Sequence, residues 1–189
     1  MRSMNYCRAG MGVATLNGYL YVVGGYDNEG EDLNTVERYD PRTNIWTEIS
    51  AMNMAPRDFG CSTYHGMLYV ASECDTNHKC SMLTFQMFNP ESNSWNLTKA
   101  SSSESYCDIT SIRLLELNNR LVLITSCKTM DNDDEEESTM DNVDEVKWNL
   151  EVYDPDLNIL TRQDQLTLNI FGNNENIKKG FVFCVINFS

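Results

Sequence analysis

An eight-residue pattern that occurs three times constrains this chain more than any other feature. It consists of an aromatic residue, Asp or Asn, and Pro, with a large apolar residue six positions after the Asp or Asn. The three copies are YDPRTNIW from Tyr39, FNPESNSW from Phe88 and YDPDLNIL from Tyr153. Asp40 and Asn89 are 49 residues apart, and Asn89 and Asp154 are 65 apart. Repeats of about 40 to 50 residues made of short strands are typical of β-propeller blades.

A second repeated feature is a tight-turn signal followed by an apolar run of strand length. The copies are NGYLYVV at Asn17, HGMLYVA at His65, NNRLVLI at Asn118 and KGFVFCV at Lys179. Each unit therefore divides into four short strands. In the first unit we predict strands at about Gly12 to Leu16, Tyr19 to Gly24, Thr35 to Tyr39 and Ile45 to Ile49.

The spacing of the repeats predicts a single partial domain, with repeat 1 at about 4–50, repeat 2 at 51–98, repeat 3 at 99–162 and an incomplete repeat 4 at 163–189. The longer second interval predicts an acidic insertion at 128–147 in repeat 3. It is not an EF-hand loop, because Glu136 and Asn142 stand where Gly and an acid are needed. We expect a solvated segment that can be removed, with a dock for a basic partner as the alternative.

The motifs together resemble the kelch repeat. The resemblance rests on the paired Gly24 and Gly25, on Tyr39, Asp40, Pro41 and Trp46, and on the segment MNMAPRDFG between units. In the later units the matching positions are Phe88, Pro90, Trp95, Tyr153 and Pro155. The resemblance to the kelch-like (BTB-kelch) family implies an all-β propeller of four-stranded antiparallel blades, most often six. About three and a half repeats, with no BTB or BACK region, predict a partial propeller that is prone to associate.

Composition argues against several classes of binding partner and indicates a cellular compartment. The chain of 189 residues has 14 Lys and Arg against 28 Asp and Glu, which disfavours nucleic acid and anionic membranes as partners. Seven cysteines without CxxC spacing fit reduced thiols better than a secreted disulfide framework. With no apolar run of signal-peptide or membrane-spanning type, we expect a cytoplasmic protein.

No chemistry of catalysis or metal binding is indicated. Cys74, His78 and Cys80 lie close together, but a structural zinc site needs four ligands, and the other histidine, His65, occupies a turn. Copper sites would need more histidines, and no Ser, His and Asp arrangement is apparent. We therefore predict that the chain is not an enzyme and holds no cofactor and no metal.

Function is predicted to reside on one rim of the propeller. In an antiparallel blade the second-to-third loops and the linkers between blades share a rim, and variable loops on a rigid scaffold commonly carry recognition. The expected partner-binding residues are Arg8, Tyr26, Asp27, Glu29, Asp32, Arg57, Asp58 and Glu73. For any one of these residues, an ordinary solvated side chain is the alternative. By resemblance, the chain would capture a target protein for a cullin-RING ubiquitin ligase, or alternatively bind actin.

Overall fold

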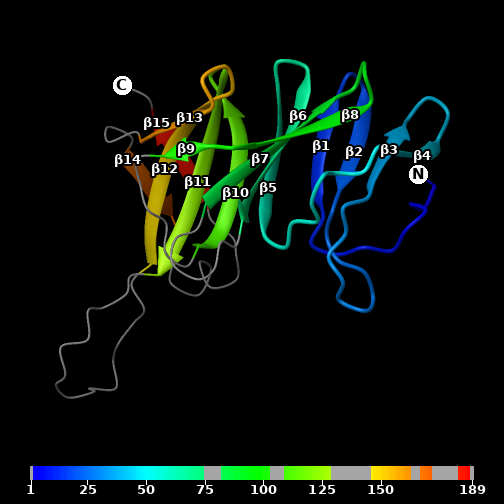
Figure 1. The fold of residues 1–189 in the computed structure, drawn as a ribbon, viewed down its shortest axis with the longest axis horizontal. Coiled ribbons are helices and arrows are strands. Elements are labelled where there is room, and N and C mark those ends of the chain that lie inside the picture. Colours follow the sequence, from blue (N-terminus) through cyan, green and yellow to red (C-terminus); the bar gives the residue numbers. More distant parts are fainter. Residues whose placement is uncertain are drawn as a thin grey trace.

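The protein is described here by a computed structural model that covers residues 2–74, 82–102, 109–128, 146–162, 167–171 and 183–187. These residues form strands and turns and no helix, as the sequence predicts (Figure 1). Accordingly, this part of the chain contains no helix long and apolar enough to cross a membrane.

Blade 1 is an antiparallel sheet in the order β1-β2-β3-β4. Its strands are β1 (Gly12–Leu16), β2 (Tyr19–Val23), β3 (Val36–Asp40) and β4 (Ile45–Ile49). Each bound lies within one residue of the predicted one. The turn between β1 and β2 is Asn17 and Gly18, both with positive φ, as expected for a two-residue hairpin.

Blades 2 and 3 repeat this order. Blade 2 consists of β5 (Phe59–Tyr64), β6 (Met67–Cys74), β7 (Met82–Asn89) and β8 (Ser94–Lys99). Blade 3 consists of β10 (Ile109–Leu117), β11 (Arg120–Lys128), β12 (Val146–Asp154) and β13 (Ile159–Arg162). A short strand that the sequence did not predict, β9 (Ser101–Ser102), pairs in parallel with β13. A separate hairpin joins β14 (Thr167–Phe171) to β15 (Phe183–Asn187).

The three blades stand side by side, with β1 next to β5 and β5 next to β10 (Figure 1). Neighbouring blades therefore pack face to face. Between blades 1 and 2 the ring of Tyr21 lies 5.9 Å from that of Phe88. Between blades 2 and 3 Phe85 stacks on Tyr153 at 3.7 Å. Close packing of first strands requires a small residue, and a Cβ at Gly60 would clash with the backbone of Leu114. The core therefore lies in layers between the blades.

The paired glycines decide where the second strand ends. Gly24 and Gly25 have φ of 57° and 87°, and the chain leaves the sheet there. In blades 2 and 3 the matching positions, Ser72 with Glu73 and Thr125 with Ser126, stay within β6 and β11. In these blades the second and third strands stay paired beyond those positions, in blade 3 as far as Lys128 and Val146. The predicted insertion at 128–147 is thus too wide at both ends, because its first residue and last two belong to strands. Residues 129–145 lie outside the described part.

The repeated aromatic, Asp or Asn and Pro pattern forms the turn between the third and fourth strands. Asp40 accepts a hydrogen bond from the Arg42 amide at 2.9 Å, and Asn89 and Asp154 accept matching bonds. Trp46 donates from Nε1 to the carbonyl of Arg2, and Trp95 donates to that of Ser50. Each tryptophan therefore ties the linker that precedes its blade. Pro41, Pro90 and Pro155 occupy the next position in each turn.

Candidate functional site: the loop rim of blades 1 and 2

The loop from Gly24 to Thr35 joins β2 to β3 and forms the centre of the candidate site. The Tyr26 backbone exchanges two hydrogen bonds with that of Ala9, at 3.0 and 2.9 Å. Within the loop, Asp27 accepts bonds from the amides of Glu29 and Glu31 at 2.8 and 3.0 Å, which fixes a tight turn. The loop therefore has a defined shape, and Tyr26, 47% exposed, lies with its ring against Gly10.

The linker between blades 1 and 2 meets this loop. Arg57 Nε lies 3.1 Å from an Asp32 carboxylate oxygen, with the two side chains 78% and 24% exposed. A pair so open to water contributes little to stability, about 1 kcal/mol or less. Asp58 is exposed beside it, and Glu73, half-buried on β6, has partners of its own. Linker and loop therefore present charged groups at one place.

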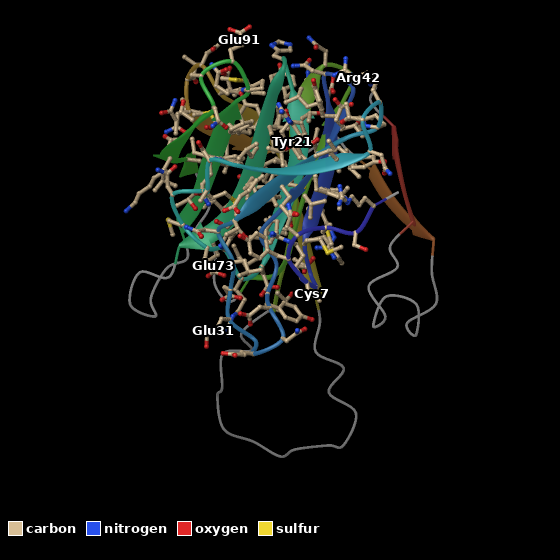
Figure 2. The ribbon with its side chains drawn as sticks, turned by 90° about the vertical axis from the view of Figure 1, so that its right-hand side faces the viewer. Cys7, Tyr21, Glu31, Arg42, Glu73 and Glu91 are labelled. Carbon is tan, nitrogen blue, oxygen red and sulfur yellow. The ribbon has the colours of Figure 1, made fainter. Side chains whose placement is uncertain are left out.

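In Figure 2 the labelled side chains lie toward two opposite ends of the molecule, apart from Tyr21 between them. Cys7, Glu31 and Glu73 lie at the lower end of the view, whereas Arg42 and Glu91 lie at the opposite end. We call the lower surface the loop rim; among described residues it carries Tyr26, Asp27, Glu29, Glu31, Asp32, Arg57, Asp58 and Glu73. All of the predicted partner-binding residues except Arg8 lie there with exposed or half-exposed side chains.

Arg8 points into blade 1, and its side chain is fully covered. Its guanidinium donates to the carbonyls of Gly24 and Thr35 at 2.9 and 3.0 Å and forms an ion pair with Glu37 at 3.1 Å. The expectation that it faces a partner is therefore corrected. Arg8 holds the two ends of the Tyr26 loop together, whereas Arg57, one residue nearer to its following glycine, turns outward.

A buried polar residue in the third strand is a feature that sequence reasoning missed. Glu37 accepts bonds from the amides of Asn5 and Tyr6, and in blade 2 Gln86 bonds both the amide and the carbonyl of Met54. Glu151 has the same place in blade 3 and is also buried. The sequence signal that could have revealed these buried residues is a polar residue two positions before each repeated aromatic. It marks where a linker crosses its blade.

Metal and acid–base chemistry receive no support from the described residues. They contain no group of three His, Cys, Asp or Glu side chains suited to a metal ion. His78 and Cys80, from the rejected zinc candidate, lie outside the described residues, and His65 occupies a turn with φ of 45°. Burial between blades 1 and 2 raises the pKa of the Cys61 thiol to about 11. That thiol is far from being a nucleophile.

Comparison with known proteins identifies the repeat. Residues 7–53 match the sequence model of the Kelch motif family. Blade 1 is therefore similar to the kelch motif over its whole length. Blades 2 and 3 share its strand order, register and turn contacts, so the described part of the chain consists of propeller blades of the kelch type.

Several relatives carry the same motif. An influenza virus NS1A-binding protein homolog of Mus musculus is 43% identical over 70 residues, which are 37% of this chain and 11% of the relative. Human Kelch-like protein 31 is 36% identical over 76 residues, with the same coverages. An F-box/kelch-repeat protein of Arabidopsis thaliana is 33% identical over 101 residues, 52% of this chain and 26% of the relative. The chain thus spans between about a tenth and a quarter of the relatives it matches.

Proposed function

We propose that the chain is a protein-interaction module that captures a target protein on the loop rim of blades 1 and 2. The observation that carries this proposal is the Tyr26 loop. An exposed aromatic side chain stands on a loop fixed by backbone bonds to Ala9 and by the buried Arg8. Aromatic and arginine side chains on a rigid support are the usual anchors of protein interfaces, because they add contact area at little entropic cost.

Arg57 is the second anchor in this proposal. Its side chain is 78% exposed and lies beside Asp32 at 3.1 Å, so the guanidinium is accessible to a partner. The surrounding carboxylates of Asp27, Glu29 and Asp58 favour a target segment that carries basic residues, and would speed its association at low salt.

The wider role that we propose is target recognition for a cullin-RING ubiquitin ligase. Its support is the kelch repeat together with relatives named as kelch-like proteins and as an F-box/kelch-repeat protein. Actin binding is the alternative prediction. We also propose that the protein is cytoplasmic. Affinity capture of the tagged chain from cytoplasmic extract, with quantification of co-purified cullin subunits, tests the ligase role. Co-sedimentation with filamentous actin tests the alternative.

The chain itself offers a matched control for the rim assignment. Arg42 forms an ion pair with Asp40 at 3.1 Å and is 73% exposed, which closely matches Arg57 with Asp32, but it lies at the opposite end of the molecule (Figure 2). We expect Arg57→Ala or Tyr26→Ala to weaken capture of a target by about 1 to 2 kcal/mol, or roughly 5- to 30-fold. Arg42→Ala should leave capture unchanged. An equal loss in the Arg42 variant would show that the loop rim is not the binding face.

A further inference from the structure

The linker before β1 and the Tyr26 loop, residues 24–35, are bonded to each other as one unit. The backbone of Ala9 exchanges two hydrogen bonds with that of Tyr26. A Cβ at Gly10 would lie 2.9 Å from a ring carbon of Tyr26, so the aromatic ring rests directly on the linker backbone. Arg8, the next residue toward the N-terminus, has a fully covered side chain. The linker therefore forms the base on which the loop lies.

The guanidinium of Arg8 reaches both ends of this loop. Its Nη1 donates to the carbonyls of Gly24 and Thr35 at 2.9 and 3.0 Å. Its Nη2 donates to the Thr35 hydroxyl and to the Glu37 carboxylate, both at 3.1 Å. The chain leaves β2 at Gly24 and enters β3 just after Thr35. One rigid planar group therefore fixes where the loop begins relative to where it ends.

Blade 2 shows that a blade does not need an arginine in this place. It forms the same four-stranded order, although Pro56 stands four residues before its first-strand glycine, where blade 1 has Arg8. A proline has no hydrogen-bond donor. The linker of blade 2 is held instead by neutral Gln86, which bonds both the amide and the carbonyl of Met54. Tying a linker to the third strand therefore requires neither an arginine nor an ion pair.

The two blades differ in what happens at the end of the second strand. In blade 2, β6 and β7 stay paired as far as Cys74 and Met82, so the backbone ladder holds both strands. In blade 1 the chain turns out of the sheet, and the Gly24 amide bonds the Thr35 carbonyl at 3.1 Å. Arg8 adds three hydrogen bonds to these same two residues. The additional bonds of Arg8 therefore serve the loop more than the sheet.

We propose that Arg8 is a positioning residue for the loop rim, which holds the Tyr26 loop in the shape that captures a target. This inference rests on the proposed function, since it concerns the surface on which the target would bind. Arg8 does not touch the target, because its side chain is fully covered. It acts by keeping Tyr26 ordered before association, so less conformational entropy is lost when the target binds.

Two conservative substitutions separate the loop bonds of Arg8 from its ion pair. Arg8→Lys keeps a positive charge beside Glu37, but one nitrogen replaces the two that bond separate acceptors. Glu37→Gln removes the ion pair and leaves the bonds from Arg8 to Gly24 and Thr35 in place, as neutral Gln86 does the same work in blade 2. If Arg8 acted only through the stability of the blade, both variants would loosen the loop in proportion to their loss of stability.

Hydrogen–deuterium exchange of the full chain, followed by mass spectrometry, tests the positioning without any target. In Arg8→Lys the peptide that covers residues 24–35 should exchange about tenfold faster or more, whereas the peptide around Arg42 should not change. In Glu37→Gln the two peptides should change by the same factor. Thr35→Val, which removes only the hydroxyl that Arg8 bonds, is the milder second variant and should loosen the same peptide to a smaller extent.

Thermal melts establish that each variant is folded. Selective loosening of residues 24–35 in Arg8→Lys and Thr35→Val supports the inference. It is overturned if that peptide exchanges at the wild-type rate in both variants, or if Glu37→Gln loosens it as selectively as Arg8→Lys does.

Capture from cytoplasmic extract by the tagged chain tests the role in binding. Proteins whose recovery falls in Tyr26→Ala define the targets of the loop rim. Their recovery should fall about fivefold or more in Arg8→Lys and stay at the wild-type level in Glu37→Gln. Unchanged recovery in Arg8→Lys, despite a loosened loop, overturns the role of Arg8 in capture. If Tyr26→Ala loses no protein, the proposed function fails together with that role, and the exchange result alone decides whether Arg8 holds the loop.

Discussion

Substituting Gly25 by alanine should unfold blade 1 at its loop rim, and the cost can be worked out from the structure. Gly25 has φ of +87°, and a Cβ there would clash with the carbonyl oxygen of Ala9. The left-handed conformation alone costs an alanine about 1 to 2 kcal/mol. Relief of the clash must also move Ala9 away from Tyr26, which loses two backbone hydrogen bonds of about 1 kcal/mol each. We expect a total loss of about 3 to 4 kcal/mol.

Gly18→Ala is the matched control. Gly18 has a similar φ of +78°, but nothing lies within 4 Å of the place where its Cβ would be. It should therefore show the conformational cost alone, about 1 to 2 kcal/mol. Thermal unfolding of both variants measures the difference, with about 2 to 4 °C expected for each kcal/mol in a chain of this size. The reasoning is refuted if Gly25→Ala melts at the same temperature as Gly18→Ala.

Three further predictions concern the interior. Trp46→Ala should lower the free energy of unfolding by about 3 to 5 kcal/mol, because the ring is 7% exposed; an unchanged denaturation midpoint would contradict this. Arg8→Ala should cost about 3 to 5 kcal/mol by leaving Glu37 buried and unpaired. Adding Glu37→Gln should recover part of that loss, and no recovery in the denaturation curve would speak against a charge effect. Burial raises the pKa of the Cys61 thiol to about 11, so iodoacetamide at pH 8 should label exposed Cys7 well before Cys61, as mass spectrometry would show.

The same thiol should make the free energy of unfolding depend on pH in the alkaline range. Its folded pKa, about 11, lies above the ordinary value of 9.0, so Cys61 favours folding below pH 9 and this contribution is lost as the pH rises toward 11. The stability advantage of the wild-type chain over Cys61→Ala should therefore shrink by about 2 kcal/mol between pH 8 and pH 10.5. Urea denaturation at pH 8 and pH 10.5 would measure it. A constant difference would contradict burial of the thiol.

Local sequence was enough to place the four strands of blade 1 within one residue. The Asn17 and Gly18 turn and the Tyr39 pattern fix where strands begin and end, because turns depend on the φ preferences of a few neighbouring residues. The sequence also predicts which loops share a rim, because chain direction alternates from strand to strand. Even the single-residue offset between Arg8 and Arg57 relative to the following glycine was visible in the sequence.

Tertiary structure decided what those positions do. Arg8 and Arg57 are the same residue in similar linkers, yet one is buried against Glu37 and the other is exposed beside Asp32. The outcome depends on partners 29 and 25 positions away, which no local pattern reveals. Likewise, Val13 and Leu114 are matching strand residues, and Leu114 is buried because it packs against blade 2, whereas Val13 is 51% exposed. Burial is a property of the neighbouring sheet, so the sequence of one strand determines its alternation of faces but not which face is covered.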